Sequence, residues 1–255
     1  MAAPKLESYI RKVIQPQPFG YIPLSTLKVK SSSEPKLECG TAFSRMLLSS
    51  AVQHTAAYGA CGADCALAPL LGRIQARISA LKPAEGQKEG KRVDRFVEAM
   101  RTSEKIDQTF ISSLCSLLTY APVSTGGVRP YPDGGYVVPA SSDVRLIWQL
   151  SRRSYAFLYG EGSEVEFKSI FDVNADNFST ATIDFLTTQA AYKVSPLTAP
   201  PQARDVLLVY VWAVLAGVDR FGIYNPMWDV LYWGRVSDVP REVRDEIAGY
   251  VLKVS

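Results

Sequence analysis

The side chains best suited to chemistry in this sequence are a histidine and two cysteines within one stretch. His54, Cys61 and Cys65, with Cys39 upstream, are residue types that hold zinc. Structural zinc sites use two closely spaced ligand pairs. Cys61 and Cys65 form one loose pair, and the sequence offers no second pair. We therefore predict no metal site: His54 satisfies a helix end, and the cysteines are small, buried apolar residues.

Two further patterns look like ligand loops and fail on inspection. Residues 172–176 read Asp-Val-Asn-Ala-Asp, as a calcium loop begins, but Asn177 and Ile183 stand where that loop needs Gly and Glu. We interpret them as a turn and a helix cap. Gly160 and Gly162 lack the third glycine of a dinucleotide loop and indicate a hairpin turn.

Three carboxylates lie close together in the sequence and are the candidates for acid–base catalysis. Glu161, Glu164 and Glu166 could act as a pair in a hydrolase. Glu164 and Glu166 fall on one face of a strand by alternation, which favours a solvated sheet edge. We predict no catalytic residue and no cofactor, and we keep an enzyme of unrecognised type as the second alternative.

Basic residues are the stronger candidates for function, because phosphate binding needs local positive potential rather than one fixed spacing. Seven of them crowd into 23 residues, and a doublet follows later. The predicted polyanion-binding residues are Arg73, Arg77, Lys82, Lys88, Lys91, Arg92, Arg95, Arg152 and Arg153. The alternative is a solvated face that Glu85, Glu89, Asp94 and Glu98 largely neutralise. The later tryptophans and tyrosines could stack on unpaired bases or form a membrane-facing belt, or be core and interface.

The elements that must position these residues are mostly helical. The spacing of hydrophobic residues and the positions of Gly and Pro predict a helix-dominated α+β fold with a small antiparallel sheet and an extended N-terminal arm. The predicted helices are a short one at residues 5–14, then 41–55, 67–81, 92–101, 104–120, 176 or 179 to 192, 204–218 and a C-terminal helix after Asp238. A break at residues 59–62 separates the second from the third. The predicted strands are residues 27–30 with 36–39, then 144–150, 154–159 and 164–170.

The chain is predicted to form an arm, residues 1–24, and one globular domain, residues 25–255. The charged segment 82–91 marks an internal boundary, and residues 122–140, rich in Gly and Pro, form an exposed loop. The arm is apolar and interrupted by prolines, which favours docking on the chain's own core or on a neighbouring subunit. Its self-assembly residues are Leu6, Ile10, Val13, Ile14, Phe19 and Tyr21.

Composition indicates a globular protein: 47% of the residues are hydrophobic and 21% are charged. Residues 1–100 carry 14 Lys and Arg against 8 Asp and Glu, whereas residues 101–255 carry 14 against 17. A basic front and an acidic back could attract each other between copies. No secretory signal is evident, and the longest apolar run, residues 206–218, is too short to cross a bilayer. We therefore expect an intracellular location.

Three stretches resemble the matrix proteins of rhabdoviruses. Residues 21–24 (Tyr-Ile-Pro-Leu) with 27–30 (Leu-Lys-Val-Lys) resemble the extended entry into their globular domain, and residues 40–48 resemble their first core helix. Residues 150–157, with 162–167 and acidic residues from Asp172 onward, resemble their later strand pair. These stretches cover about a quarter of the chain and contain no diagnostic motif. The proline-rich budding motif of many members is missing, and residues 82–140 have no counterpart.

The resemblance implies a non-enzymatic viral structural protein that polymerises, condenses the ribonucleoprotein and touches the inner membrane leaflet. Its partners would be itself, the viral ribonucleoprotein or RNA, and an anionic membrane surface. Its location would be the virion and the cytoplasm or nucleus of the host cell. The alternative is a nucleocapsid or coat protein, a capsid component that binds RNA directly along a groove.

Overall fold

The structure is a computed structural model, and it divides the chain into two compact units. It describes residues 5, 6, 9, 10, 22, 24–38, 45–103, 105–120, 139–162, 164–173 and 178–249. The sheet unit comprises residues 1–37 and 161–255, and the helical unit comprises residues 38–160.

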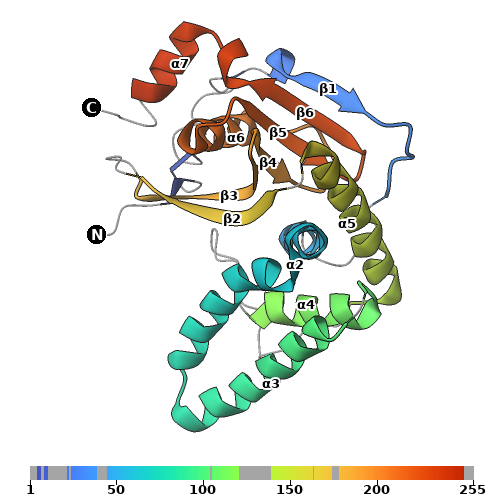
Figure 1. The fold of residues 1–255 in the computed structure, drawn as a ribbon. Helices are drawn as coiled ribbons and strands as arrows, with labels where there is room; N and C mark the ends of the chain where they lie inside the picture. The colour runs from blue at the N-terminus through green and yellow to red at the C-terminus, as the bar shows by residue number, and fades with distance from the viewer. Residues whose placement is uncertain are drawn as a thin grey trace. The chain divides into compact units, whose positions relative to one another are not determined.

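The sheet unit is built on six strands in the order β1-β6-β5-β4-β3-β2 (Figure 1). Their bounds are β1 Lys28–Ser31, β2 Val165–Asp172, β3 Thr180–Thr187, β4 Ala190–Val194, β5 Arg220–Asn225 and β6 Val230–Arg235. Neighbouring strands are antiparallel except for β4 and β5, which are parallel. The sheet is therefore mixed, and larger than the sequence predicted.

The helix α6, Ala203–Ala216, connects the parallel pair β4 and β5, because parallel neighbours need a crossover connection. It packs against β3, β4 and β5, and all eight residues from 206 to 213 are buried. Its capping box joins Gln202 and Asp205, and Gly217 ends it in the left-handed conformation at φ 68°. The prediction of a buried helix over residues 204–218 is confirmed.

The core of the sheet unit also includes part of the N-terminal arm. Leu6 and Ile10 are buried with Phe178 and with the inner residues of α6, and Ile22 lies in the same cluster. The short helix α7, Arg241–Ile247, lies within the predicted C-terminal helix and adds Ile247 to this core.

The helical unit contains four helices and no strand among its described residues. Their bounds are α2 Arg45–Ser79, α3 Pro83–Arg101, α4 Gln108–Tyr120 and α5 Ser141–Glu161, whose last residue belongs to the sheet unit. The helices α2, α3 and α4 pack on one another. Gly62, at φ 85°, kinks α2 within the predicted break.

The α+β class with helix dominance is confirmed, but several predicted elements are wrong. Residues 144–150 and 154–159 are not strands, because their buried residues follow helical spacing along α5. Residues 176–192 are not a helix: a segment with three threonines, an isoleucine and a phenylalanine forms β3, and β4 follows.

Three further predictions about connections are also wrong. Residues 36–39 are not the hairpin partner of β1, which pairs with β6 instead. The charged segment 82–91 is not a loop boundary, because Pro83 begins α3 in the first-turn position that suits proline. The predicted turn at Gly160 and Gly162 joins α5 to β2 rather than two strands. The predicted loop 122–140 lies outside the described residues except at 139 and 140.

Candidate polyanion-binding surface

All nine predicted polyanion-binding residues belong to the helical unit. Arg73 and Arg77 lie near the end of α2, Lys82 is the N-cap of α3, and Arg152 and Arg153 lie in α5. The remaining four are exposed on α3, and we name them the basic crest: Lys88, Lys91, Arg92 and Arg95. The helical unit contains fourteen Lys and Arg against ten Asp and Glu, whereas the sheet unit contains fourteen against fifteen.

The basic crest occupies the solvent side of α3. Its members are separated by three, four and seven residues, so they share one helix face and extend about 10 Å along the axis. The buried residues of α3 are Gly86, Val93, Val97 and Met100. At 3.6 residues per turn the centres of these two sets are half a turn apart. The crest therefore points directly away from the packed face.

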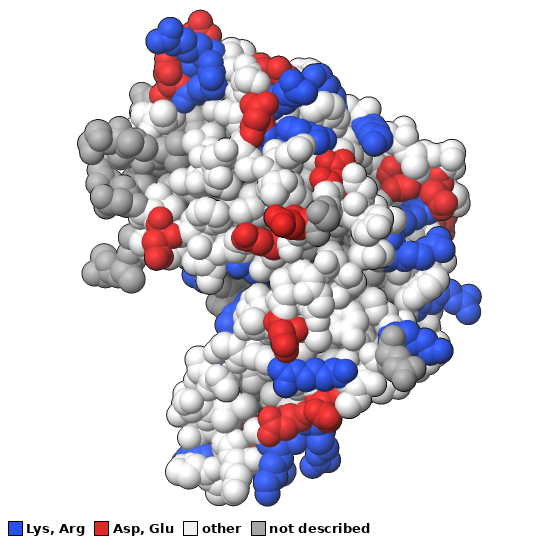
Figure 2. All heavy atoms as spheres, in the orientation of Figure 1, with Lys and Arg blue, Asp and Glu red and all other residues white. Residues whose placement is uncertain are grey.

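Acidic side chains flank the basic crest on both sides. At helical spacing, Glu85 and Glu89 follow one flank, and Asp94 and Glu98 follow the other. In Figure 2, blue and red side chains form adjacent bands over the lower part of the molecule, where Figure 1 places α3. The positive potential is therefore confined to a narrow line, because the flanking carboxylates reduce it to either side.

The doublet in α5 separates into one buried and one exposed arginine. Arg153 is 8% exposed, so its assignment to the polyanion-binding set is wrong: consecutive helical residues point about 100° apart, and this one faces inward. Arg152 is exposed, and its guanidinium lies 5.4 Å from the ring centre of Trp148. On α2, Arg73 is exposed and donates from Nε to the carbonyl oxygen of Pro69 at 3.0 Å.

A line of exposed aromatic residues runs along the same face of α5, and sequence analysis missed it. Trp148, Tyr155 and Tyr159 are 42%, 38% and 72% exposed, and with Arg152 they follow the helical spacing of four, seven and eleven residues. We name these four residues the aromatic–arginine stripe. The rings of Tyr155 and Tyr159 are 6.0 Å apart. This spacing is visible in the sequence, but the incorrect strand prediction for residues 144–159 concealed it.

The packing of α2 against α5 holds part of the stripe in place. A Cβ atom on Gly59 would lie 3.0 Å from the ring of Tyr155, so the glycine lets the ring approach the α2 backbone. The aliphatic residues of α5 at 144, 146, 147, 150 and 158 are all buried. The exposed face of α5 thus presents rings and guanidinium groups, with the small Ala156 but no Val, Leu or Ile beside them.

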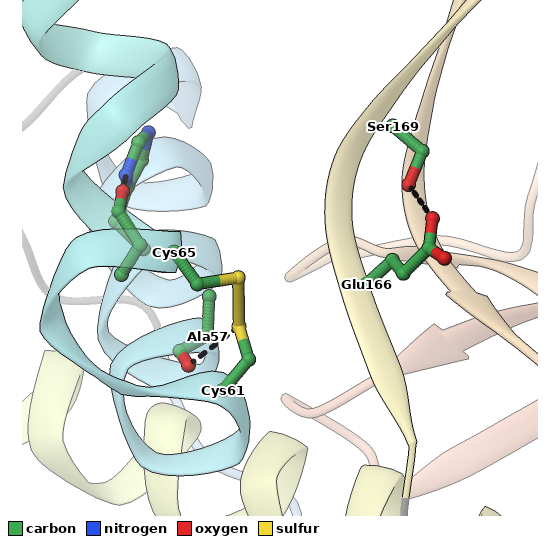
Figure 3. The surroundings of a disulfide bond; sticks show 7 residues. Ala57, Cys61, Cys65, Glu166 and Ser169 are labelled. Carbon is green, nitrogen blue, oxygen red and sulfur yellow. Dashed lines mark hydrogen bonds between the residues drawn. A yellow bond between two sulfur atoms is a disulfide. The ribbon is translucent and has the colours of Figure 1, made fainter.

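The residues considered for zinc form a structural cluster instead. The Nδ1 atom of buried His54 lies 2.7 Å from the carbonyl oxygen of Ala66, across the kink of α2. Cys61 and Cys65 are half-buried and joined in a disulfide (Figure 3), so the prediction that they are free, buried apolar residues is wrong. Four residues of separation bring their Cα atoms to 5.8 Å, within bridging distance.

No metal site emerges from the described residues: they contain no group of three or more His, Cys, Asp or Glu that could hold an ion. The third candidate cysteine, Cys39, lies outside them. Buried Cys115 is a free thiol, and burial, with the negative charge of Asp143 as a smaller cause, raises its pKa to about 12.

The three candidate carboxylates do not form one site. Glu164 and Glu166 are exposed at the edge strand, as predicted, and Ser169 donates its hydroxyl to Glu166 at 2.7 Å (Figure 3). Glu161 instead accepts hydrogen bonds from the Tyr192 hydroxyl and, at 3.1 Å, from the Arg220 guanidinium. Burial and the bond to Glu161 raise the pKa of Tyr192, which therefore remains neutral. This cluster stabilises the sheet unit.

The predicted self-assembly arm is only partly described. Leu6 and Ile10 fill the chain's own core, which corrects their assignment to a neighbouring subunit. Val13, Ile14, Phe19 and Tyr21 lie outside the described residues. The core placement has a simple cause: α6 and the sheet leave apolar surface between them that these two side chains cover.

Comparison with known proteins adds no relative. No family model, curated protein or solved structure matches this chain. No helix in the described part of the chain is long and apolar enough to cross a membrane.

Proposed function

We propose that this chain is a non-enzymatic structural protein of viral matrix type, which assembles with copies of itself and binds the phosphate groups of a polyanion. The observation that supports this best is the basic crest, which places four positive side chains on the solvent side of α3. Phosphate backbones bind such a surface through charge, without a shaped pocket.

The shape of the basic crest favours RNA as the polyanion. The acidic residues on both flanks confine the positive potential to a line about 10 Å long. A nucleic-acid strand presents its phosphates in a line as well, whereas a bilayer presents a broad charged surface that would also meet the flanking carboxylates. This favours contact with a ribonucleoprotein through α3 and supports the alternative of a coat protein that binds RNA directly.

Self-assembly has support in the charges of the two sheet edges. Among the described strands, β1 and β2 each pair with one neighbour, so the sheet ends in two open edges. The exposed residues of β1 include Lys28 and Lys30, whereas Glu166 and Asp172 are exposed on β2. A basic edge of one copy can meet the acidic edge of the next, and such a head-to-tail contact generates rings or filaments.

A charge-reversal experiment tests the polyanion half of the proposal. In Lys91→Glu/Arg95→Glu we expect weaker binding of single-stranded RNA and a smaller dependence of affinity on salt, by about one counterion for each basic side chain that no longer binds a phosphate. The control Arg204→Glu/Arg235→Glu makes the same change of net charge on exposed residues of the sheet unit and should bind normally. Fluorescence anisotropy with labelled RNA and co-sedimentation with phosphatidylserine vesicles distinguish the two polyanions. Wild-type protein that bound neither would disprove this half of the proposal.

A charge swap tests the assembly half. Lys30→Glu and Glu166→Lys should each reduce the assembled size measured by light scattering, because each puts like charges across the contact. The double variant Lys30→Glu/Glu166→Lys restores opposite charges and should assemble again. If both single variants assembled as the wild type does, the sheet edges would not form the contact.

A further inference from the structure

We infer that the aromatic–arginine stripe of α5 binds unpaired bases of single-stranded RNA by stacking, without preference for sequence. This inference rests on the proposed function and adds to it a second surface and a ligand class. The stripe joins Trp148, Arg152, Tyr155 and Tyr159 along about 16 Å of one helix face.

The composition of the stripe fits nucleic acid. Every base has an aromatic face, so rings on a protein surface stack on any sequence, and arginine adds both a planar group and a positive charge for the phosphate. The guanidinium of Arg152 already lies over the ring of Trp148, at 5.4 Å from its centre. Tyr159 is 72% exposed, so its ring faces solvent.

The charges along α5 are complementary to a polyanion. Between residues 144 and 160 the helix carries two exposed arginines, Arg145 and Arg152, beside the buried Arg153, and no acidic residue. Its acidic residues are at the ends: buried Asp143 accepts a hydrogen bond from the backbone of Ala140 at 3.1 Å, and Glu161 is bound to Tyr192 and Arg220. Arg145, one turn before Trp148, is exposed and extends the positive charge along the helix.

A membrane surface fits the stripe less well than RNA does. Helices that lie in a bilayer interface insert aliphatic and aromatic side chains together to a depth of about 5–10 Å. The Val, Leu and Ile side chains of α5 are all buried, so apart from the small Ala156 its exposed face has no aliphatic residue to insert. Tyrosine and arginine keep polar tips at the surface, which suits the wet interface of RNA.

The decisive experiment separates stacking from charge. Labelled oligouridylate of twelve nucleotides is titrated with the full chain at several salt concentrations. Tyr159→Ala should weaken binding about tenfold, and Trp148→Ala/Tyr159→Ala about a hundredfold, with the salt dependence unchanged because every basic side chain remains in place. Tyr159→Phe keeps the ring and should bind like wild type. Ile170→Ala, which removes a 71% exposed side chain in the sheet unit, is the matched control.

Three further measurements complete the test. Circular dichroism and thermal melts should show that Tyr159→Ala is folded, since this side chain is mostly exposed. Tyr159→Ala should not change the affinity for duplex RNA with the same number of phosphates, because the bases of a duplex are already stacked on one another. Tyr159→Ala should likewise leave binding to phosphatidylserine vesicles unchanged.

The outcomes separate this inference from the proposed function. If Tyr159→Ala and the double variant bound oligouridylate as wild type does, while Lys91→Glu/Arg95→Glu did not, the stacking surface would be disproved and the proposed function would stand. If wild-type protein bound no polyanion, both would fail. If the aromatic variants lost vesicle binding and kept RNA binding, the stripe would be a membrane contact and the inference would be overturned.

Discussion

The sheet unit and the helical unit use their charged residues differently. In the sheet unit, Lys193 and Asp205 form a 2.7 Å ion pair, and each side chain is less than a quarter exposed. In the helical unit, the pair between Arg101 and Asp64 is 49% and 87% exposed. Half-buried pairs are costly to break, whereas exposed pairs contribute little. Half-buried ion pairs therefore help to hold together the sheet unit, which also has exposed pairs, Lys28 with Asp238 and Arg241 with Asp245.

Aromatic residues follow the same division. In the sheet unit Trp212, Tyr192 and Phe221 are almost completely buried, whereas in the helical unit the stripe on α5 exposes three rings. A buried ring stabilises the fold through the apolar area it removes from water. An exposed ring adds little stability and leaves its surface available for binding. The exposed rings of α5 and the exposed basic residues of α3 therefore both support the proposal that the helical unit carries the binding surface.

The largest effect is expected from removal of the N-terminal arm. Deletion of residues 1–24 takes Leu6, Ile10 and Ile22 out of the core of the sheet unit, where they are at most 2% exposed. Removal of a buried aliphatic side chain costs about 2–5 kcal/mol, so the deletion should lower the free energy of unfolding by several kcal/mol. Urea denaturation measures it, and deletion of residues 1–4 alone is the control. An unchanged midpoint would show that the arm is not part of the core.

A smaller loss is expected when a half-buried ion pair of the sheet unit is broken. Asp184→Ala removes the carboxylate that binds Lys168, whose side chain is 18% exposed, and should lower the free energy of unfolding by about 3 kcal/mol. The matched control is Asp64→Ala in the helical unit, where the exposed pair with Arg101 should cost less than about 1 kcal/mol. Equal losses in the two variants would abolish the contrast between the units.

Sequence patterns predicted the helices that carry strong local signals. The apolar run of α6 and the glycine break in α2 have clear local causes, and both are confirmed. The segment of α5 was misassigned because Val, Ile, Trp, Tyr and Phe favour strands, although its buried positions follow helical spacing. The pairing of β1 with β6 joins residues about two hundred positions apart, which no local pattern encodes.

The candidate site was predictable only in part, for a related reason. Residue type alone gave the nine basic positions, and all of them fall in the helical unit. Arg152 is exposed and can bind a partner, whereas Arg153 is buried. Which of the two side chains points to solvent depends on whether the segment is a helix or a strand, and the segment was predicted as a strand. The disulfide was missed because Cys61 and Cys65 were assigned as free apolar residues, although a separation of four residues brings their Cα atoms to 5.8 Å.

Removal of the disulfide should have a moderate effect confined to the helical unit. The bridge closes a short loop, so its loss in Cys61→Ser/Cys65→Ser should cost at most about 2 kcal/mol. The carbonyl oxygen of Ala57, 3.2 Å from the Cys61 sulfur, offers a hydrogen-bond acceptor to the hydroxyl and offsets part of this cost. Hydrogen exchange should quicken in residues 57–66 and not in α6. Faster exchange in α6 would show that the bridge also stabilises the sheet unit.

Alkaline pH should weaken the helical unit through Cys115. Its pKa is about 12 in the folded chain and near 9.0 when unperturbed, so between these values the unfolded chain loses the thiol proton and the folded chain keeps it. Stability is therefore unaffected below pH 9 and falls as the pH rises, by about 1.4 kcal/mol per unit for this group. The slope of unfolding free energy between pH 9 and 10 should be shallower in Cys115→Ala. An identical slope would mean that this thiol titrates normally.

The smallest effect on stability is expected at the basic crest, where the contrast between the units is sharpest. Lys88 has Lys91 and Arg92 as like-charged neighbours three and four residues away on α3, and one opposite neighbour, Glu85. Lys88→Ala relieves this repulsion and introduces a better helix former, so the free energy of unfolding should stay constant or rise by a few tenths of a kcal/mol. The same substitution should weaken RNA binding and reduce its salt dependence by about one counterion.

A substitution that preserves or raises stability while it lowers affinity identifies a residue that contributes to binding rather than to the stability of the fold. Loss of stability in Lys88→Ala, measured by urea denaturation, would instead place the crest among the charges that hold the molecule together.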